Sequence, residues 1–197
     1  MRLILVDLPC DKRFHFDPLA LCRPIWELRC GMSSLAEKMI GKVGASDIAC
    51  FVPPYMADAY KAHTDRPVND ASTLEGDDLL LVHARVKAAT FDVPTTGPSE
   101  AAFDDDGDLL YARIAQDDLA KLKTDSIDAL VESAKSSLPA GKTGLETWNY
   151  TWDLVLENPE QITRDFAAAG RSGIEGTIEE PSGIRGSKGD GFVGRAT

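Results

Sequence analysis

Three short apolar runs that alternate with helical patterns constrain the fold of this chain most strongly. They are residues 2–6 (RLILV), 47–52 (DIACFV) and 79–82 (LLLV). Each run is too short for a buried helix and is apolar at nearly every position, which predicts a strand covered on both faces. One helical pattern separates the first two runs and another follows the second. This rhythm predicts an α/β domain with a mostly parallel sheet and helices on both faces.

Local signals place the predicted helices. Ser34, with Glu37 three residues later, predicts a capped helix start, and Gly41 or Gly44 would end that helix. The Pro-Pro pair at 53–54 is expected to open the helix after the second run. The remaining predicted elements are a strand over 109–114 and helical segments over 117–138, 148–156 and 158–169, the last capped by Asn158 with Pro159 at its first position.

Two polar segments are predicted as loops. Residues 11–23 are polar and interrupted by proline, which is typical of a long functional loop. The acidic segment 104–108 (DDDGD) could suggest calcium, but the further ligands of a calcium loop do not follow at the required spacing. We therefore interpret it as a solvated hairpin turn.

Composition excludes several classes of protein. The net charge of −11 argues against a nucleic-acid binder, because phosphate contacts need a clustered Lys/Arg face. No stretch is long and apolar enough to span a membrane, and the first apolar run is too short for a signal-peptide core, so we expect a cytoplasmic protein with no membrane partner. The four cysteines lack C-x-x-C pairing, which favours reduced thiols over a zinc site.

The composition changes abruptly after Gly170. Residues 171–197 are rich in glycine and poor in large apolar side chains, so we divide the chain into a domain over 1–170 and a tail over 171–197. Isoleucine and valine recur loosely in the tail, but too few copies exist to bury a core. The tail is either a linker or the first coil of a repeat structure.

Three segments together resemble a family of sugar nucleotidyltransferases related to the uridyltransferase (pyrophosphorylase) domain of the bifunctional N-acetylglucosamine-1-phosphate uridyltransferase. They are LILVDLPCDKRFHFDPLALCRPIWELRCGMSSLAEK, LLLVHARV and WNYTWDLVLENPEQITRDF. The resemblance implies a Rossmann-like nucleotide-diphospho-sugar transferase fold. It also implies that the tail enters a left-handed β-helix, through which a longer parent protein would form a trimer.

The resemblance implies a reaction in which a nucleoside triphosphate and a sugar-1-phosphate give a nucleotide-sugar and pyrophosphate, with Mg²⁺ as cofactor. Such chemistry needs alignment of two polyanions and neutralisation of charge. Relatives cradle the phosphates with a glycine-rich loop, whereas the corresponding loop here contains no glycine. The side chains of Lys12 and Arg13 would therefore make the phosphate contact, at the carboxyl edge of the first strand.

Two further arginines are candidates by the same resemblance. Arg23 falls where relatives place a phosphate-contacting lysine, and it could equally pair with Glu27 at the surface. Arg29 is a candidate for substrate binding, with local pairing as the alternative.

The resemblance also points to residues near the metal. Arg85 stands where relatives place a magnesium-binding Asp, and its charge could replace part of the ion's role. Asp153 resembles the second ligand, although a capping role is equally consistent with its position. Asp7, at the end of the first strand, could bind a ribose hydroxyl or the metal. His83 would either line the pocket or lie buried in its neutral form.

Two functions follow from these residues. The first is a magnesium-assisted nucleotidyltransferase. The second is a non-catalytic domain that binds a nucleotide or sugar phosphate or serves in assembly, and it is favoured by the missing glycines and by Arg85 at the expected metal position. Walker, G-x-G-x-x-G and G-x-S-x-G motifs are absent from the sequence, which argues against kinases, dehydrogenases and serine hydrolases.

Overall fold

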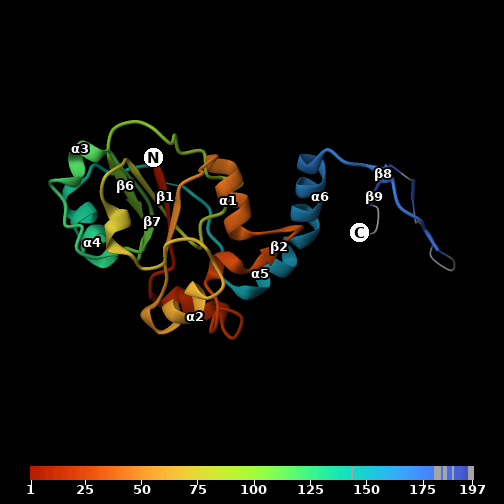
Figure 1. The fold of residues 1–197 in the computed structure, drawn as a ribbon, viewed down its shortest axis with the longest axis horizontal. Coiled ribbons are helices and arrows are strands. Elements are labelled where there is room, and N and C mark those ends of the chain that lie inside the picture. The colour runs from red at the N-terminus through yellow and green to blue at the C-terminus, as the bar shows by residue number, and fades with distance from the viewer. Residues whose placement is uncertain (143, 180–182, 184–185, 188, 195–197) are drawn as a thin grey trace.

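The fold is built on a five-stranded mixed sheet with the strand order β4-β1-β5-β7-β6 (Figure 1). The computed structural model describes residues 1–197 except 143, 180–182, 184–185, 188 and 195–197. In it, β4 and β5 run parallel to β1 on either side, and β7 runs antiparallel to both β5 and β6. The strands are β1 (Arg2–Val6), β4 (Ile48–Phe51), β5 (Leu79–His83), β6 (Glu100–Phe103) and β7 (Leu109–Ile114). The predicted α/β class is confirmed; of the four strand pairings in this mixed sheet, two are parallel and two are antiparallel.

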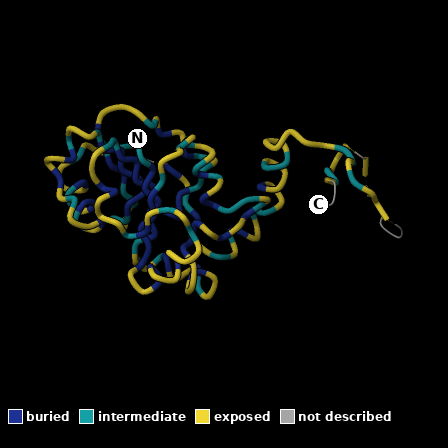
Figure 2. Tube along the Cα trace, in the orientation of Figure 1, coloured by how far each residue is buried: buried dark blue, intermediate teal, exposed yellow. Residues whose placement is uncertain are grey.

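Helices cover both faces of the sheet. One apolar core lies between the sheet and the side that carries α1 (Leu35–Val43) and α2 (Ala57–Lys61). A second core lies on the opposite side, under α4 (Ile127–Ser137) and the short α3 (Gln116–Leu119). Figure 2 shows the central strands buried between exposed loops. Strands buried on both faces explain why their sequences are continuously apolar.

The helix boundaries follow from local chemistry. The Ser34 hydroxyl accepts from the N–H of Glu37, whose carboxylate accepts from the N–H of Ser34, and α1 ends at Gly44 with φ +70°, as predicted. The prediction of one helical region over 117–138 is only partly right. The chain leaves the helix after α3, and α4 starts anew where the Ser126 hydroxyl accepts from the N–H of Ala129. Short 3-10 helices occur at Asp11–Phe16, Ile25–Glu27, Pro54–Met56 and Ala71–Leu74.

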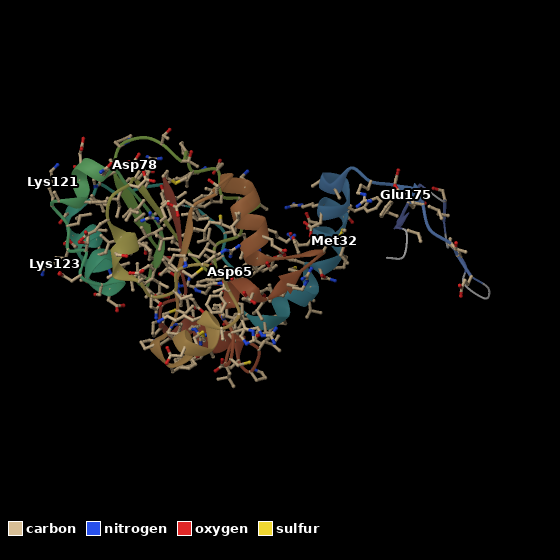
Figure 3. The ribbon with its side chains drawn as sticks, in the orientation of Figure 1. Met32, Asp65, Asp78, Lys121, Lys123 and Glu175 are labelled. Atoms are coloured by element: carbon tan, nitrogen blue, oxygen red, sulfur yellow. The ribbon has the colours of Figure 1, made fainter. Side chains whose placement is uncertain are left out.

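The C-terminal helices pack beside a small hairpin of β2 (Arg29–Cys30) and β3 (Ser33–Ser34). Here α5 (Thr151–Leu156) is shorter than predicted and α6 (Asn158–Ala169) has the predicted extent. Asn158 does not cap α6 as predicted, since Glu157 takes the cap position and the Asn158 side chain accepts from the N–H of Gly31 at 2.7 Å. The N–H of Met32 donates to Asp165 at 2.8 Å, at the junction of the hairpin and α6 (Figure 3).

Beyond α6 the chain extends away from the sheet (Figure 1). There β8 (Gly173–Ile174) pairs in parallel with β9 (Phe192–Val193), while several tail residues lie outside the described part. Within the described residues, no helix has the length and apolar character needed to cross a membrane. Cys10, Cys22, Cys30 and Cys50 form no disulfide with one another in the structure; Cys30 and Cys50 are buried, and Cys22 is exposed.

Candidate functional site

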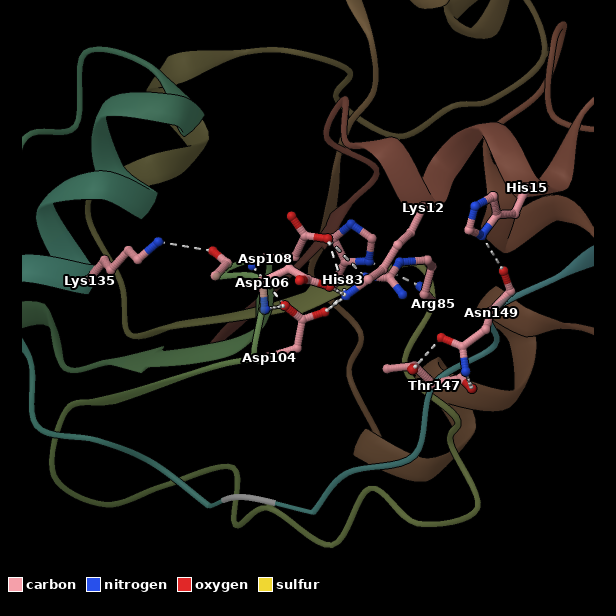
Figure 4. Close-up of polar contacts among 11 residues, drawn as sticks. Lys12, His15, His83, Arg85, Asp104, Asp106, Asp108, Lys135, Thr147 and Asn149 are labelled. Carbon is pink, nitrogen blue, oxygen red and sulfur yellow. Dashed lines mark hydrogen bonds and ion pairs between the residues drawn. The ribbon is translucent and has the colours of Figure 1, made fainter.

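A cluster of five charged side chains lies at the carboxyl edge of the sheet (Figure 4). Its two cations come from segments that follow parallel strands: Lys12 lies after β1 and Arg85 after β5. The Lys12 ammonium lies 2.6 Å from Asp104 and 2.6 Å from Asp106, and Arg85 Nη2 lies 3.3 Å from Asp104 and 3.2 Å from Asp108. We call Lys12, Arg85, Asp104, Asp106 and Asp108 the charge cluster. Three carboxylates against two cations make the charge cluster net negative.

The carboxylates of the charge cluster reach this edge on the β6–β7 turn. The turn is closed by Asp104, whose Oδ1 accepts from the N–H groups of Asp106 and Asp108, while its Oδ2 accepts from Lys12 and Arg85. Gly107 takes a positive φ of +83° within the turn. The predicted hairpin turn is therefore present, but its acids bind protein cations instead of facing solvent alone. Among the described residues, no group of three or more His, Cys, Asp or Glu side chains is arranged to hold a metal ion.

Arg85 is the most unusual member of the charge cluster, because it is buried with incomplete hydrogen bonding. Its exposed fraction is 1%, and two of its nitrogens, Nε and Nη1, have no hydrogen-bond partner among the described residues. The backbone carbonyl of Arg85 accepts from the N–H of Trp148 at 2.7 Å, which ties it to the segment before α5. Buried donors without acceptors are rare in native proteins and are costly. Arg85 is therefore the member of the charge cluster with unused hydrogen-bond donors.

Asp7 and Arg13 form a separate buried pair behind the charge cluster. Arg13 Nε lies 3.2 Å from Asp7 Oδ1, Arg13 Nη2 donates to the carbonyl of Ala20, and Asp7 Oδ2 accepts from the N–H of Ile25. Burial raises the pKa of Asp7 to about 6, although the Arg13 guanidinium and the Ile25 N–H oppose this rise. These contacts fasten the loop after β1 to the sheet, so the geometry gives both residues a positioning role.

The other two predicted arginines lie at the surface. Arg23 is exposed and forms no ion pair within the described part of the chain, so the alternative of a pair with Glu27 is not observed. The Glu27 carboxylate instead accepts from the hydroxyl of Tyr60. Arg29 is exposed on β2, donates to the carbonyl of Met32 and lines an open cavity of about 460 Å³ that shares no lining residue with the charge cluster. Neither arginine contacts the charge cluster.

Sequence reasoning missed two features beside the charge cluster. One is a stack of three rings, in which Tyr150 lies between His15 and Trp152 with centroid distances of 4.5 and 4.3 Å. His15 is held there by its contact with the Asn149 carbonyl (Figure 4). The hydroxyl of Thr151 also donates to the His15 carbonyl. His15 lies more than 130 positions before Tyr150 and Trp152 in the sequence, so no local pattern could have revealed the stack.

The second missed feature is a cavity of about 180 Å³ beside the loop after β1, which we call the His83 cavity. Its polar lining comes from Cys10, His83, Asp108, Asp128 and Glu132. His83 is 3% exposed, and burial, together with the nearby Arg85, lowers its pKa to about 3, so the ring is neutral. The His83 ring lines this cavity and is also buried and neutral, so the two alternatives stated for it are not exclusive.

Comparison with known proteins decides the family. A family model described as sugar nucleotidyl transferase matches residues 3–172, which is most of the chain. This chain belongs to the sugar nucleotidyl transferase family. The chain is similar to a solved structure from Bacillus anthracis that is provisionally identified as a glucose-1-phosphate thymidylyltransferase. The two sequences are 9% identical, and the structures match with a TM-score of 0.49 over 82% of this chain and 95% of the Bacillus anthracis chain. A search of curated proteins gives no match.

Membership of the sugar nucleotidyl transferase family raises the question of magnesium. The residues in place do not fit this ion. Arg85, a cation, occupies the position where the resemblance expects an Asp, and Asp153 Oδ2 accepts from the N–H groups of Asn149 at 2.9 Å and Tyr150 at 3.0 Å. Asp153, within the first turn of α5, thus accepts from the backbone N–H of the cap residue Tyr150, which is the capping role stated as an alternative above. The carboxylate of Asp165, on α6, forms an ion pair with Lys38 on α1.

The capping role of Asp153 can be tested through stability. Replacing Asp153 with alanine removes an acceptor for two N–H groups at the start of α5, so we expect the free energy of unfolding to fall by about 1 kcal/mol. Asp153→Asn keeps a carbonyl oxygen and should lose less. Urea unfolding monitored by circular dichroism measures both variants. An alanine variant as stable as the wild type would contradict the capping role.

Proposed function

We propose that this nucleotidyltransferase-like domain binds the phosphate of a sugar phosphate or nucleotide-sugar at the carboxyl edge of its sheet. The observation that carries the proposal is the buried guanidinium of Arg85, which has two nitrogens without partners. Phosphate oxygens are the acceptors that a guanidinium binds in a bidentate manner. Lys12 offers a second cation within the same charge cluster. Ligands of α/β sheets usually bind at this edge, beyond the carboxyl ends of the strands.

We further propose that the domain does not transfer a nucleotidyl group. A triphosphate and a sugar-1-phosphate would bring several negative charges to a region where Asp104, Asp106 and Asp108 already outnumber the cations. The Asp153 carboxylate is engaged at the start of α5. Membership of the family supports the catalytic alternative, in which Arg13 and Arg23 would act on the substrates and Asp153 would bind magnesium.

Replacing Arg85 with methionine tests the binding proposal. Wild-type protein is titrated with inorganic phosphate and with glucose-1-phosphate, and its melting temperature is recorded. A ligand present at 100 times its dissociation constant stabilises the folded state by about 2.7 kcal/mol. We expect a rise in melting temperature for the wild type and none for Arg85→Met, with Arg85→Lys intermediate because it keeps the charge but loses the fork of donors.

Arg164→Met is the matched control, because Arg164 is an exposed arginine paired with Glu160 on α6. It should respond to ligand as the wild type does. Equal stabilisation of the wild type and of Arg85→Met would contradict the proposal. A separate assay follows pyrophosphate release from each nucleoside triphosphate with sugar-1-phosphate and magnesium. Release that depends on the protein would establish the catalytic alternative, and Arg23→Ala would then show whether Arg23 takes part.

The tail supports a further part of the proposal. Gly173 pairs in parallel with Phe192 and Ile174 with Val193, and parallel pairing of this kind also joins successive coils in a parallel β-helix. We propose that residues 171–197 begin such a β-helix after a domain over 1–170. The left-handed twist of the coil, assembly as a trimer and the cytoplasmic location stay predictions. Analytical ultracentrifugation of a chain that includes the whole β-helix would test the trimer.

A further inference from the structure

The β6–β7 turn, residues 104–108, places carboxylates on the one nitrogen of Arg85 that is already in use. Arg85 Nη2 donates to Asp104 at 3.3 Å and to Asp108 at 3.2 Å. Nη2 carries two N–H groups, so these two contacts occupy both of them. The nitrogens without partners among the described residues are Nε and Nη1. The unused donors of Arg85 therefore lie beside a nitrogen that the turn occupies.

The planar geometry of a guanidinium makes this occupation important for any oxyanion ligand. A bidentate oxyanion accepts from two parallel N–H groups, which belong either to Nε and Nη2 or to Nη1 and Nη2. Both arrangements use Nη2. An oxyanion can therefore bind Arg85 in the bidentate manner only when Nη2 releases Asp104 or Asp108. Arg85 is also 1% exposed, so groups that cover it must move before a ligand from solvent reaches it.

Of the three carboxylates in the charge cluster, Asp104 is held most firmly. Its Oδ1 accepts from the N–H groups of Asp106 and Asp108. Its Oδ2 accepts from both cations of the charge cluster. Asp108 Oδ2 accepts from Arg85 and lies 3.9 Å from the Lys12 ammonium. The Asp106 carboxylate pairs with Lys12 and its side chain is 71% exposed. A ligand would therefore displace Asp108 and Asp106 before Asp104.

The attachment of the β6–β7 turn allows such a displacement without disruption of the sheet. The pairing of β6 with β7 has a register shift between Ala102 and Phe103, and residues 104–108 lie beyond it. On its other side the turn contacts α4, where the exposed Lys135 donates to the carbonyl of Gly107 at 3.1 Å (Figure 4). Contacts of this kind between exposed charged or polar groups contribute little to stability.

We propose that the β6–β7 turn is an internal competitor of the phosphate. In the unliganded chain the carboxylates of Asp106 and Asp108 occupy the two cations of the charge cluster, and they move away when a phosphate binds. This inference rests on the proposed function, because its ligand is the phosphate at Arg85. Binding is then an exchange of one set of anions for another. The free energy needed to release the turn lowers the affinity of the wild type for phosphate.

Titration with inorganic phosphate, followed by the backbone amide signals in NMR spectra, tests the inference. Asp108→Asn removes the charge that competes at Nη2, so this variant should bind phosphate about tenfold more tightly than the wild type. Asp106→Asn should tighten binding by up to about fivefold, because its ion pair is exposed. Asp105→Asn is the matched control. Asp105 lies in the same turn, is exposed and forms no ion pair within the described part of the chain, so its replacement alters the net charge equally. Its affinity should stay within about twofold of the wild type.

Adding Arg85→Met to Asp108→Asn should abolish the gain in affinity, and a gain that persists would overturn the inference. Equal affinity of the wild type and all three Asn variants would also overturn it, while the proposed function would stand. Equal tightening by Asp105→Asn and Asp108→Asn would do the same, since it would show only a general effect of charge. Binding by Asp108→Asn but not by the wild type would support the inference and contradict the proposed function for the unaltered domain. Absence of binding in every protein would contradict both.

Discussion

Replacing Gly31 with alanine is expected to lower the free energy of unfolding by about 3 kcal/mol, because the substitution combines overpacking with left-handed backbone strain. Gly31 has a φ of +79° between β2 and β3. A Cβ atom there would lie 2.5 Å from an Asp165 carboxylate oxygen and 2.9 Å from the backbone carbonyl carbon of Gln161. The hairpin and α6 would have to separate. For a chain of this length the melting temperature should fall by roughly 6–12 °C, measured by calorimetry.

Substitutions at two other glycines measure the backbone strain separately from the steric clash. Gly44 has a similar φ of +70° at the end of α1, but a Cβ atom there meets nothing within 4 Å. Gly44→Ala should therefore cost only about 1–2 kcal/mol of backbone strain. Gly41 has neither a positive φ nor a close neighbour and lies inside α1, so Gly41→Ala should stabilise by up to about 1 kcal/mol. A Gly31 variant that costs no more than the Gly44 variant would contradict the close packing of α6.

The second large effect is expected from His83 in acid. Its folded-state pKa of about 3 lies below the ordinary value of 6.5 because the ring is buried. Between these two pH values the unfolded chain takes up a proton at His83 that the folded chain does not. Acidification from pH 6.5 therefore destabilises the fold by up to about 1.4 kcal/mol per pH unit through this residue. The expected loss at pH 4.5 is on the order of 3 kcal/mol.

Asp7 acts in the opposite direction. Its folded-state pKa of about 6 lies above the ordinary 3.8, so between pH 6 and 4 the folded chain takes up the proton at Asp7 before the unfolded chain does. That uptake stabilises the fold as the pH falls. The two effects partly cancel in the wild type. His83→Gln removes the contribution of His83 and keeps that of Asp7, so this variant should gain stability relative to the wild type with each step of acidification below pH 6.5.

Urea unfolding of the wild type and of His83→Gln at half-unit pH steps from 7.5 to 4 measures this difference. Other carboxylates titrate in both proteins, so their contributions leave the difference unchanged. Two stability curves that stay parallel throughout this range would contradict the neutral, buried state of His83. Glu160→Gln, which changes an exposed acid, should follow the wild-type curve.

The fold could be predicted from the sequence wherever a local pattern determined the structure. Continuous apolar runs identified β1, β4 and β5, because strands covered on both faces need no polar position. The capping residues of α1 identified its start and end in the same way. The strand β6 was missed, since Glu100–Phe103 is short and only partly apolar. The break between α3 and α4 was also missed, because the apolar spacing continues across it.

The candidate site was harder to predict, because it depends on contacts between distant segments. The sequence pointed to Lys12 and Arg85 as cations at the carboxyl edge, and the structure brings these two together. It gave no sign that the carboxylates of residues 104–108 would meet them, since Lys12 and Asp104 are 92 positions apart. Arg13 and Asp153 carry the expected charges, but their side chains are engaged within the protein. Only the folded chain reveals which charges are already neutralised.

The antiparallel course of β7 has a consequence for how this site can be altered. Because β7 runs antiparallel to β5, it begins beside the carboxyl end of β5. The β6–β7 turn therefore lies at the carboxyl ends of the parallel strands. Asp108 of this turn lines the cavity beside the loop after β1, and the acids of the turn lie outside both apolar cores. Neutral residues at Asp106 and Asp108 would leave one carboxylate, Asp104, against the two cations, and so would change the charge cluster from net negative to net positive. The net charge at this edge of the sheet therefore depends on a short turn between two strands.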